Sequence, residues 1–213
     1  MKHAADPSIL ARFEAMKART AALGDPPPVI PADPLPDVQT RLVRSGVAQR
    51  FLGARFDGPI PSPFAEWLDR PDGRSVLLHG AVGTGKTWLA TSLLRAWFER
   101  ELGEAVWVEA SRLLETLRQA IHSDDGDAVD RWLHPSLLVL DDVGTEWLTG
   151  ERGEWRRERI AYVISHRYNW CKATIVTTNL GPKQLAALDE RIASRLSSGI
   201  VREMKGTDRR IAR

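Results

Sequence analysis

The sequence predicts an α/β fold built on a parallel β-sheet with helices on both faces. From residue 75 onward, short runs rich in Val, Ile and Leu alternate with longer segments of helical character, which is the pattern of buried parallel strands joined by crossovers. The 213 residues are 43% hydrophobic and 27% charged, enough for one substantial core. A glycine-rich stretch at 80–87 follows the first run and predicts a phosphate-binding loop between a strand and a helix.

The expected elements follow in chain order. Strands are expected at 75–79, 105–109, 137–141, 173–178 and 200–204. Helices are expected from the glycine-rich loop to about residue 101, and over 111–122, 127–133, 153–168 and 182–197. Ligands of such sheets bind beyond the carboxyl ends of the strands, so the residues that follow each strand are the candidates for chemistry.

The segment before the sheet predicts a separate arm. Asp6-Pro7 has the form of a helix N-cap and first residue, and apolar residues at helical spacing then predict an amphipathic helix over 7–23. Six prolines between residues 25 and 36 exclude helix and central strand there and indicate an extended linker. We therefore expect an arm at 1–24, a linker with a short helix (38–44) at 25–44, and a globular domain at 45–213.

Charge, cysteine content and hydrophobic runs limit the class of protein. A net charge of +2 is too small to predict nucleic-acid binding by itself. Eight Lys and Arg against four Asp and Glu between residues 183 and 213 form either a basic surface or a solvated face. Cys171 is the only cysteine, so no disulfide forms within the chain. With no signal-peptide pattern and no run of membrane-spanning length, we expect a cytoplasmic protein without a membrane partner.

The glycine-rich loop carries the most specific motif. Residues 80–87 read G-x-x-x-x-G-K-[ST], whose backbone N–H groups and following helix N-terminus surround phosphate oxygens. Lys86 can reach the β- and γ-phosphates, and the Thr87 hydroxyl can ligate Mg²⁺. The other interpretation is a glycine-rich turn with an exposed lysine, which the preceding strand disfavours. The residues expected to bind the nucleotide are Gly80, Val82, Gly83, Thr84, Gly85, Lys86, Thr87 and Trp88.

Two carboxylates follow the third strand. Asp141 is expected to hold Mg²⁺ through water, and Asp142 is expected to polarise the water that attacks the γ-phosphate. Two aspartates after a strand are by themselves more often a turn than a catalytic pair. The phosphate-binding loop upstream, with one strand between, favours the catalytic interpretation.

Polar and basic residues follow the fourth strand. Asn179 can bridge the γ-phosphate and the attacking water, or it can simply close a turn. Arg191 and Arg195 are four residues apart on one helix face. Either arginine could neutralise charge on a neighbouring subunit's γ-phosphate, or both could belong to a surface charge pattern.

In this order the motifs resemble the DnaC/IstB-type AAA+ ATPases, which include helicase loaders and the ATP-dependent helpers of some transposases. The similarity spans about residues 45–210 and also covers His166-Arg167-Tyr168. It implies a P-loop NTPase three-layer sandwich with a five-stranded sheet in 5-1-4-3-2 order, an AAA+ core without a C-terminal lid, and ATP bound between subunits. It also implies that Asn179 is sensor 1, that Arg195 is an arginine finger given in trans, with Arg191 as second choice, and that Arg210 substitutes for sensor 2.

The resemblance further implies that the paired helices at 111–133 contact single-stranded DNA. In this chain the pair carries basic and acidic side chains together: Arg112, Arg118, Arg131, Glu115, Asp124, Asp125, Asp127 and Asp130. Most tryptophans lie inside expected elements and are typical of core. Trp147 and Trp155, in the charged stretch after Asp142, are the two candidates for contact with DNA or a partner.

Three functions are compatible with these motifs. The first is a helicase loader, whose arm at 1–24 holds a replicative helicase because its apolar stripe needs a partner surface. The second is a transposase helper on duplex DNA, for which the arm is short; neighbouring genes would separate the two. The third is a small-molecule P-loop kinase, which the sequence disfavours because no arginine-rich lid is evident between the strands.

Overall fold

The structure is a computed structural model, which describes residues 35–123, 129–144 and 153–206. The chain divides into two units, Met1–Leu35 and Pro36–Arg213, and everything below concerns the second. The helix predicted at 7–23 and most of the proline-rich linker lie outside the described residues. No helix in the described ranges is both long and apolar enough to span a bilayer.

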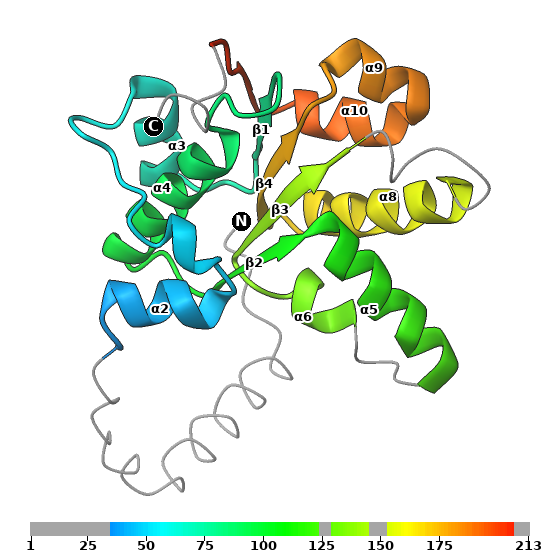
Figure 1. Ribbon diagram of the computed structural model, residues 1–213, viewed down its shortest axis with the longest axis horizontal. Helices are drawn as coiled ribbons and strands as arrows, with labels where there is room; N and C mark the ends of the chain where they lie inside the picture. Colours follow the sequence, from blue (N-terminus) through cyan, green and yellow to red (C-terminus); the bar gives the residue numbers. More distant parts are fainter. Residues whose placement is uncertain (1–34, 124–128, 145–152, 207–213) are drawn as a thin grey trace, which may run out of the picture. The chain divides into compact units, whose positions relative to one another are not determined.

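Five parallel strands form one sheet in the order β2-β3-β4-β1-β5 (Figure 1). Their bounds are β1 Ser75–His79, β2 Ala105–Glu109, β3 Leu137–Val143, β4 Ala173–Thr178 and β5 Ile200–Glu203. The observed order confirms the predicted 5-1-4-3-2 sheet, and each strand begins at its predicted residue. The strand β3 continues two residues past its predicted end, through the pair of aspartates.

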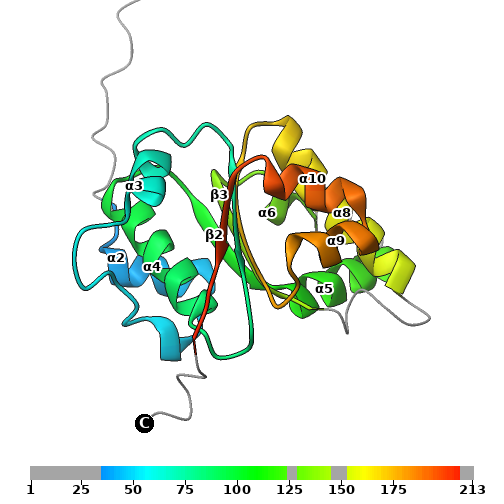
Figure 2. The same ribbon diagram turned by 90° about the horizontal axis from the view of Figure 1, so that it is seen from above.

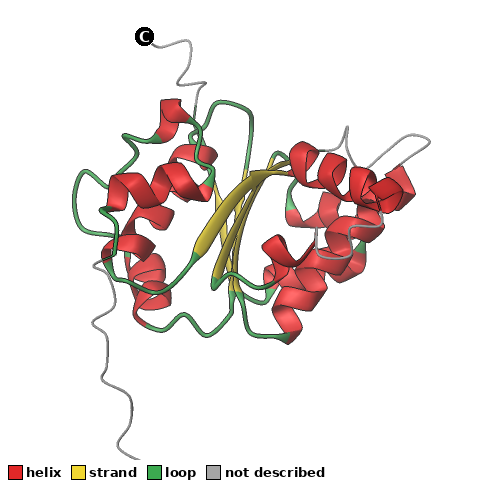
Figure 3. Ribbon diagram, turned by 90° about the horizontal axis from the view of Figure 1, so that it is seen from below, coloured by secondary structure: helices red, strands yellow, loops and turns green. Residues whose placement is uncertain are grey.

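Helices cover both faces of the sheet, which makes three layers (Figures 2 and 3). One face carries α2 Val38–Ser45, α3 Ser62–Asp69 and α4 Lys86–Glu99, with a 3₁₀ turn at Gln49–Phe51. The other face carries α5 Ala110–Ser123, α6 Asp130–Leu133, α8 Gly153–Asn169, α9 Pro182–Leu188 and α10 Glu190–Ser197. The short helix α3, which begins with Ser62-Pro63, was not predicted, although proline in the first turn is a known start signal.

The continuous apolar runs of the strands reflect a core on each side of the sheet. In β1, Val76 and Leu78 pack in the core under α4, whereas Leu77 packs in the core under α8 and α10. Leu138 and Val139 of β3 divide between the two cores in the same way. Because successive strand residues point to opposite faces, a strand that is covered on both sides needs apolar residues at every position.

Two boundaries differ from those expected. The segment 182–197 is two helices because Asp189 is extended and its side chain accepts hydrogen bonds from the N–H groups of Arg191 and Ile192, capping α10. The helix α2 packs with the sheet unit: Leu42 is fully buried, and the Arg41 guanidinium donates to the Phe98 carbonyl at 2.9 Å. The compact unit therefore begins at Pro36 rather than near residue 45.

A buried arginine joins the helical layer to the amino ends of the strands. Arg167 is fully buried near the end of α8 and donates to the carbonyls of Trp132, Leu133 and Pro135 at 2.9–3.0 Å. It also donates to the Ala173 carbonyl at 2.6 Å and to the Thr174 hydroxyl at 3.0 Å. Burial lowers the pKa of Arg167 to about 9, so the side chain is still charged at neutral pH.

Replacing Arg167 should destabilise the domain strongly. Arg167→Leu leaves several buried carbonyls without a donor, and we expect a loss of about 3 kcal/mol or more in the free energy of unfolding. Urea unfolding followed by circular dichroism would measure this. The matched control is Arg131→Ala, an exposed arginine over the Trp132 ring, for which we expect a loss below about 1 kcal/mol. Equal losses in the two variants would contradict the anchoring role.

Candidate functional site

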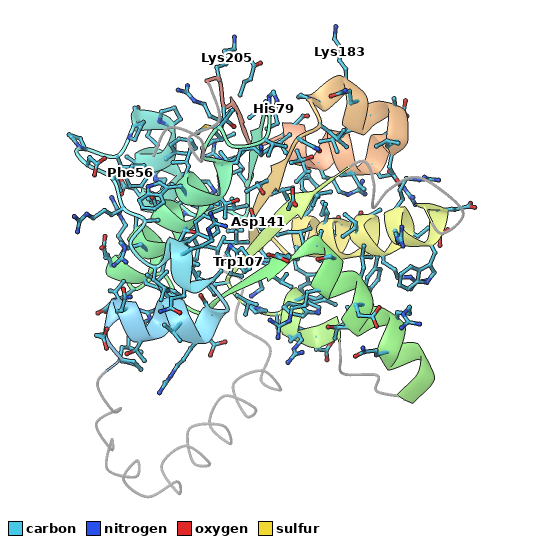
Figure 4. The ribbon with its side chains drawn as sticks, viewed as in Figure 1. Phe56, His79, Trp107, Asp141, Lys183 and Lys205 are labelled. Atoms are coloured by element: carbon cyan, nitrogen blue, oxygen red, sulfur yellow. The ribbon has the colours of Figure 1, made fainter. Side chains whose placement is uncertain are left out.

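The sheet register brings the carboxyl ends of four strands together. His79, the last residue of β1, pairs with Thr178 of β4 and with Glu203 of β5. Thr178 also pairs with Val143 of β3. The glycine-rich loop, the aspartate pair and Asn179 therefore leave the sheet at one edge, where Figure 4 shows His79 at the end of β1 and Asp141 on β3.

The loop at 80–85 is held in shape from inside. A Cβ on Gly80, whose φ is +142°, would overlap the Met204 carbonyl oxygen just beyond β5, so only glycine fits there. Thr84, which is buried, donates from its hydroxyl to the Ala81 carbonyl at 2.8 Å. The helix α4 begins directly after the loop, at Lys86, so its first N–H groups face the position that a phosphate would take.

The Lys86 ammonium lies inside this loop. Its Nζ donates to the carbonyls of Gly80 and Ala81, both at 2.8 Å, and the residue is only 9% exposed. A cation held within a ring of backbone groups is matched to an anionic ligand, since phosphate oxygens are stronger acceptors for an ammonium than carbonyls. Val82 and Trp88, in contrast, are exposed at 59% and 38%, on the solvent side of the same loop and helix.

A buried carboxylate connects α4, β3 and β4. Asp141 is 5% exposed and accepts from the Thr87 hydroxyl at 3.1 and 3.2 Å. It also accepts from the Thr177 hydroxyl at 2.5 Å, and Thr177 in turn accepts from the Asp142 N–H at 2.8 Å. Thr177 thus fixes the orientation of Asp141. Its role was not predicted, because a threonine inside a strand carries no motif.

Burial makes Asp141 a weaker acid than an exposed aspartate. Desolvation raises its pKa from 3.8 to about 6, against the opposing hydrogen bonds from Thr177 and Thr87. The neighbouring charges of Asp142 and Glu109 raise the pKa further. Glu109 ends β2 directly opposite Asp141 in the sheet register, and the sequence motifs did not point to it.

Asp142 leaves the strand register next to Asp141. It is exposed and has a φ of +58°, in the left-handed region, and the β3–β4 ladder is irregular between Leu140 and Val143. Such bulges redirect a side chain at a functional edge. The two aspartates therefore have different environments, one buried and one facing solvent.

The oxygen ligands present suit Mg²⁺. The Thr87 hydroxyl and the Asp141 carboxylate are within hydrogen-bond distance of one another, and Mg²⁺ takes one or two protein oxygens together with phosphates and water. The described residues hold no group of three or more His, Cys, Asp or Glu side chains positioned for a metal ion. Phosphate oxygens and water would supply the remaining ligands of a Mg²⁺ ion at these two residues.

The candidate sensor Asn179 lies at the same edge as the loop. It is exposed and directly follows Thr178, whose hydroxyl donates to the Val143 carbonyl and accepts from the Leu180 N–H at 3.0 Å. These bonds tie the end of β4 to β3, so Asn179 and Asp142 leave neighbouring strands side by side.

The two candidate arginines lie elsewhere and differ from each other. Arg191 forms a two-bond ion pair with Asp189, at 3.1 and 2.7 Å. Arg195 lies in the last turn of α10, which leads into Ile200 at the start of β5. Ile200 pairs with Val76 near the amino end of β1, so Arg195 is at the sheet edge opposite the loop, a strand length of about 13 Å or more away. Arg195 therefore cannot serve the loop of its own chain.

The remaining candidate residues lie away from the loop or outside the described part of the chain. Arg210 and Trp147 lie outside the described residues. Trp155 is partly buried against the core under α8, with Arg159 over its ring at 5.9 Å. In α5, Arg118 pairs with Glu115 at 2.9 Å, so part of the basic charge expected for DNA contact is neutralised within the helix.

The fold and the loop define the class of this protein as an AAA+ P-loop core. A family model described as IstB-like ATP binding protein matches residues 65–200. The chain therefore belongs to the IstB-like ATP-binding proteins, within the DnaC/IstB family of AAA+ ATPases, which confirms the resemblance found in the sequence.

The related sequences come from insertion sequences and from replication initiation. A putative ATP-binding protein in an insertion sequence of Mycobacterium tuberculosis is 34% identical over 118 residues, 54% of this chain and 44% of that protein. The chromosomal replication initiator DnaA of a Caulobacter species is 27% identical over 176 residues, 77% of this chain and 35% of that protein. The chain thus spans less than half the length of these curated relatives.

Solved structures of similar fold include a helicase loader. The DnaC helicase loader superposes with a TM-score of 0.63 and 26% identity, covering 74% of this chain and all of that one. The structure of DnaI superposes with a TM-score of 0.60 and 20% identity, covering 77% of this chain and 94% of that one, a likeness of fold.

Removing the Asp141 charge should make stability less dependent on pH. Because folding raises this pKa, the folded state binds more protons between pH 4 and pH 6, so the wild type loses stability as pH rises through that window. Asp141→Asn should stabilise the nucleotide-free protein by up to about 3 kcal/mol more at pH 8 than at pH 4. Urea unfolding at the two pH values measures this.

The control for this experiment is Asp57→Asn, at an exposed carboxylate, which should change stability by less than about 0.5 kcal/mol. If Asp141→Asn had the same effect at pH 4 and pH 8, Asp141 would not be the buried weak acid described above.

Proposed function

We propose that this chain is an ATP-dependent helicase loader of DNA replication, which hydrolyses ATP with Mg²⁺ at sites completed by neighbouring copies, binds single-stranded DNA and delivers a replicative helicase. The observation that carries the proposal is the division of the machinery between two edges of the sheet. Lys86, Thr87 and Asp141 lie at one edge, and Arg195 leads into the strands at the other. Such a chain can complete its own site only by assembling.

In this proposal the residues of the loop bind the phosphates of ATP, and the residues at the ends of β3 and β4 orient the attacking water. Lys86 exchanges its carbonyl partners for β- and γ-phosphate oxygens. Thr87 and Asp141 hold Mg²⁺, which supplies charge neutralisation on the phosphates when bound. Asp142, exposed beside them, orients a water, and Asn179 on the next strand contacts that water or the γ-phosphate. Arg195 of a neighbouring copy neutralises the charge that develops as the bond to the γ-phosphate breaks.

Support for the partner assignment is of two kinds. The DnaC helicase loader matches over its whole solved chain at 26% identity. Residues 1–24 come before the compact unit that begins at Pro36, and the apolar stripe expected from their sequence would need a partner surface. The proposed organisation is an arm at 1–24, a linker before the compact unit, and an ATPase domain that continues to residue 213.

A transposase helper is the second candidate. The family model is the IstB-like one, and the relative from Mycobacterium tuberculosis belongs to an insertion sequence. The same ATPase edge would serve either protein, because the two functions differ in the partner and in whether the DNA is single-stranded or duplex. The partner therefore decides between them.

Mixing two inactive variants tests the shared site. Arg195→Ala keeps the nucleotide edge, and Asp142→Asn keeps the arginine edge, so each alone should hydrolyse ATP at least 100-fold more slowly than wild type. Mixed, they should regain a substantial fraction of turnover, measured as phosphate release, because some sites combine an intact Asp142 with an intact Arg195. The Arg195→Ala variant should still bind ATP. A mixture no more active than its components would contradict a site shared between subunits.

Partner capture distinguishes the two functions. The full chain with ATP should retain a replicative helicase in co-purification, and deletion of residues 1–34 should lose that capture while leaving nucleotide binding unchanged. Lys86→Ala, which should not bind nucleotide, is the control for dependence on ATP. Retention of a transposase in place of every helicase tested would replace the loader proposal with the helper. Undiminished capture after the deletion would exclude the arm as the binding element.

A further inference from the structure

We infer that Tyr168 is a positioning residue that supports Arg195 for action on a neighbouring copy's nucleotide. Tyr168 is the penultimate residue of α8 and is 44% exposed. The guanidinium carbon of Arg195 lies 5.8 Å from the centroid of its ring. This inference rests on the proposed role of Arg195 and deepens it, because it names the residue that sets the direction of that side chain.

The guanidinium of Arg195 has few hydrogen bonds within the described part of its own chain. Its Nη1 donates to the Arg191 carbonyl at 3.1 Å, one turn back along α10. Its Nε is buried and has no hydrogen-bond partner in the described ranges. A buried donor without a partner is uncommon, and no carboxylate among the described residues pairs with this arginine. The aromatic ring is therefore the main fixed contact of the charged group.

Arg191 shows the contrast on the same helix. Its guanidinium is paired with both oxygens of Asp189, which is almost buried at its side chain, and this pairing lowers the pKa of Asp189. To reach a neighbour's phosphate, Arg191 would first have to break that ion pair. Arg191 is thus engaged with a residue of its own chain, whereas Arg195 is available for an outward role. The Tyr168 ring lies under Arg195.

The backbone that carries the Tyr168 ring is held firmly in place. Arg167, the preceding residue, is anchored in the core by its hydrogen bonds to the strand ends and to α6. The backbone beyond Tyr168 turns back at once, with the Cys171 N–H on the Tyr168 carbonyl at 3.2 Å and the Lys172 N–H on the Arg167 carbonyl at 2.8 Å. α10 packs on α8, so both partners of the contact are fixed by the same pair of helices.

A cation over an aromatic face is attracted to the ring without using its N–H donors. That property distinguishes the ring from a carboxylate, which would neutralise the arginine and occupy its donors. Tyr168 can therefore limit the directions available to the Arg195 side chain and leave its charge and free donors for a phosphate. The Tyr168 hydroxyl makes no hydrogen bond with any described residue, so the ring alone should suffice.

The test introduces Tyr168→Leu either in the subunit that supplies the arginine or in the subunit that binds the nucleotide. In the mixture of Arg195→Ala and Asp142→Asn subunits, only the Asp142→Asn subunit supplies a working arginine. Tyr168→Leu added to that subunit should lower the phosphate release of the mixture by about 3- to 30-fold, the range for a lost cation–π contact. The same change added to the Arg195→Ala subunit should alter it by less than about twofold.

Two matched variants complete the experiment. Tyr168→Phe in the arginine-supplying subunit should keep the turnover of the parent mixture, since it keeps the ring. Tyr162→Leu in that subunit should do the same, because the ring of this exposed tyrosine of α8 lies tilted against His166 rather than under an arginine. The affinity for ATP, measured by calorimetry, should be equal in all variants, so that the loss is confined to turnover.

The outcomes separate the inference from the proposal beneath it. If the parent mixture recovers activity but Tyr168→Leu has no effect, or has the same effect in either subunit, the positioning role of Tyr168 is wrong and the shared site stands. If the parent mixture recovers nothing, the shared site and the inference both fail.

Discussion

The hydrogen bonds that converge on the Asp141 carboxylate are the constraint on which the candidate site depends. They tie the first turn of α4 to β3 through Thr87, and β3 to β4 through Thr177. Burial destabilises the charged form of this carboxylate when no cation is present, and its raised pKa reflects that cost. A cation beside Asp141 would therefore stabilise the site, and its binding would act on one helix and two strands at once, namely α4, β3 and β4.

In the proposed function, the opposite edge of the sheet supplies the arginine that completes the site of a neighbouring copy. The helices α8 and α10 both end there, where they return to β4 and β5, and there they bring Tyr168, Arg195 and the anchored Arg167 together. A parallel sheet with crossover helices has two chemically different edges. In the assembly proposed above, the arginine edge of one copy would lie against the nucleotide edge of the next, so assembly and turnover would depend on the same arrangement.

Much of this could be predicted, and the failures have definite causes. The strand starts, the sheet order and the loop followed from local apolar runs and a short motif, each of which is read within a few neighbouring residues. The break at Asp189 was missed because a helix-capping aspartate resembles any polar residue inside a helical segment. The place of α2 in the sheet unit was missed because it depends on Arg41 reaching the Phe98 carbonyl, a contact between residues far apart in the chain.

The sequence by itself determined that a triphosphate loop, an aspartate pair and a later arginine occur in one α/β chain of the DnaC/IstB family, because those features are encoded by residue type and spacing. Only the tertiary structure decided which residues act on one another. It made Asp141 the buried aspartate, with Thr177 holding it, and it placed Arg195 over Tyr168 while Arg191 pairs with Asp189. Burial and contact arise from distant segments meeting across the sheet, and no local pattern in the chain records them.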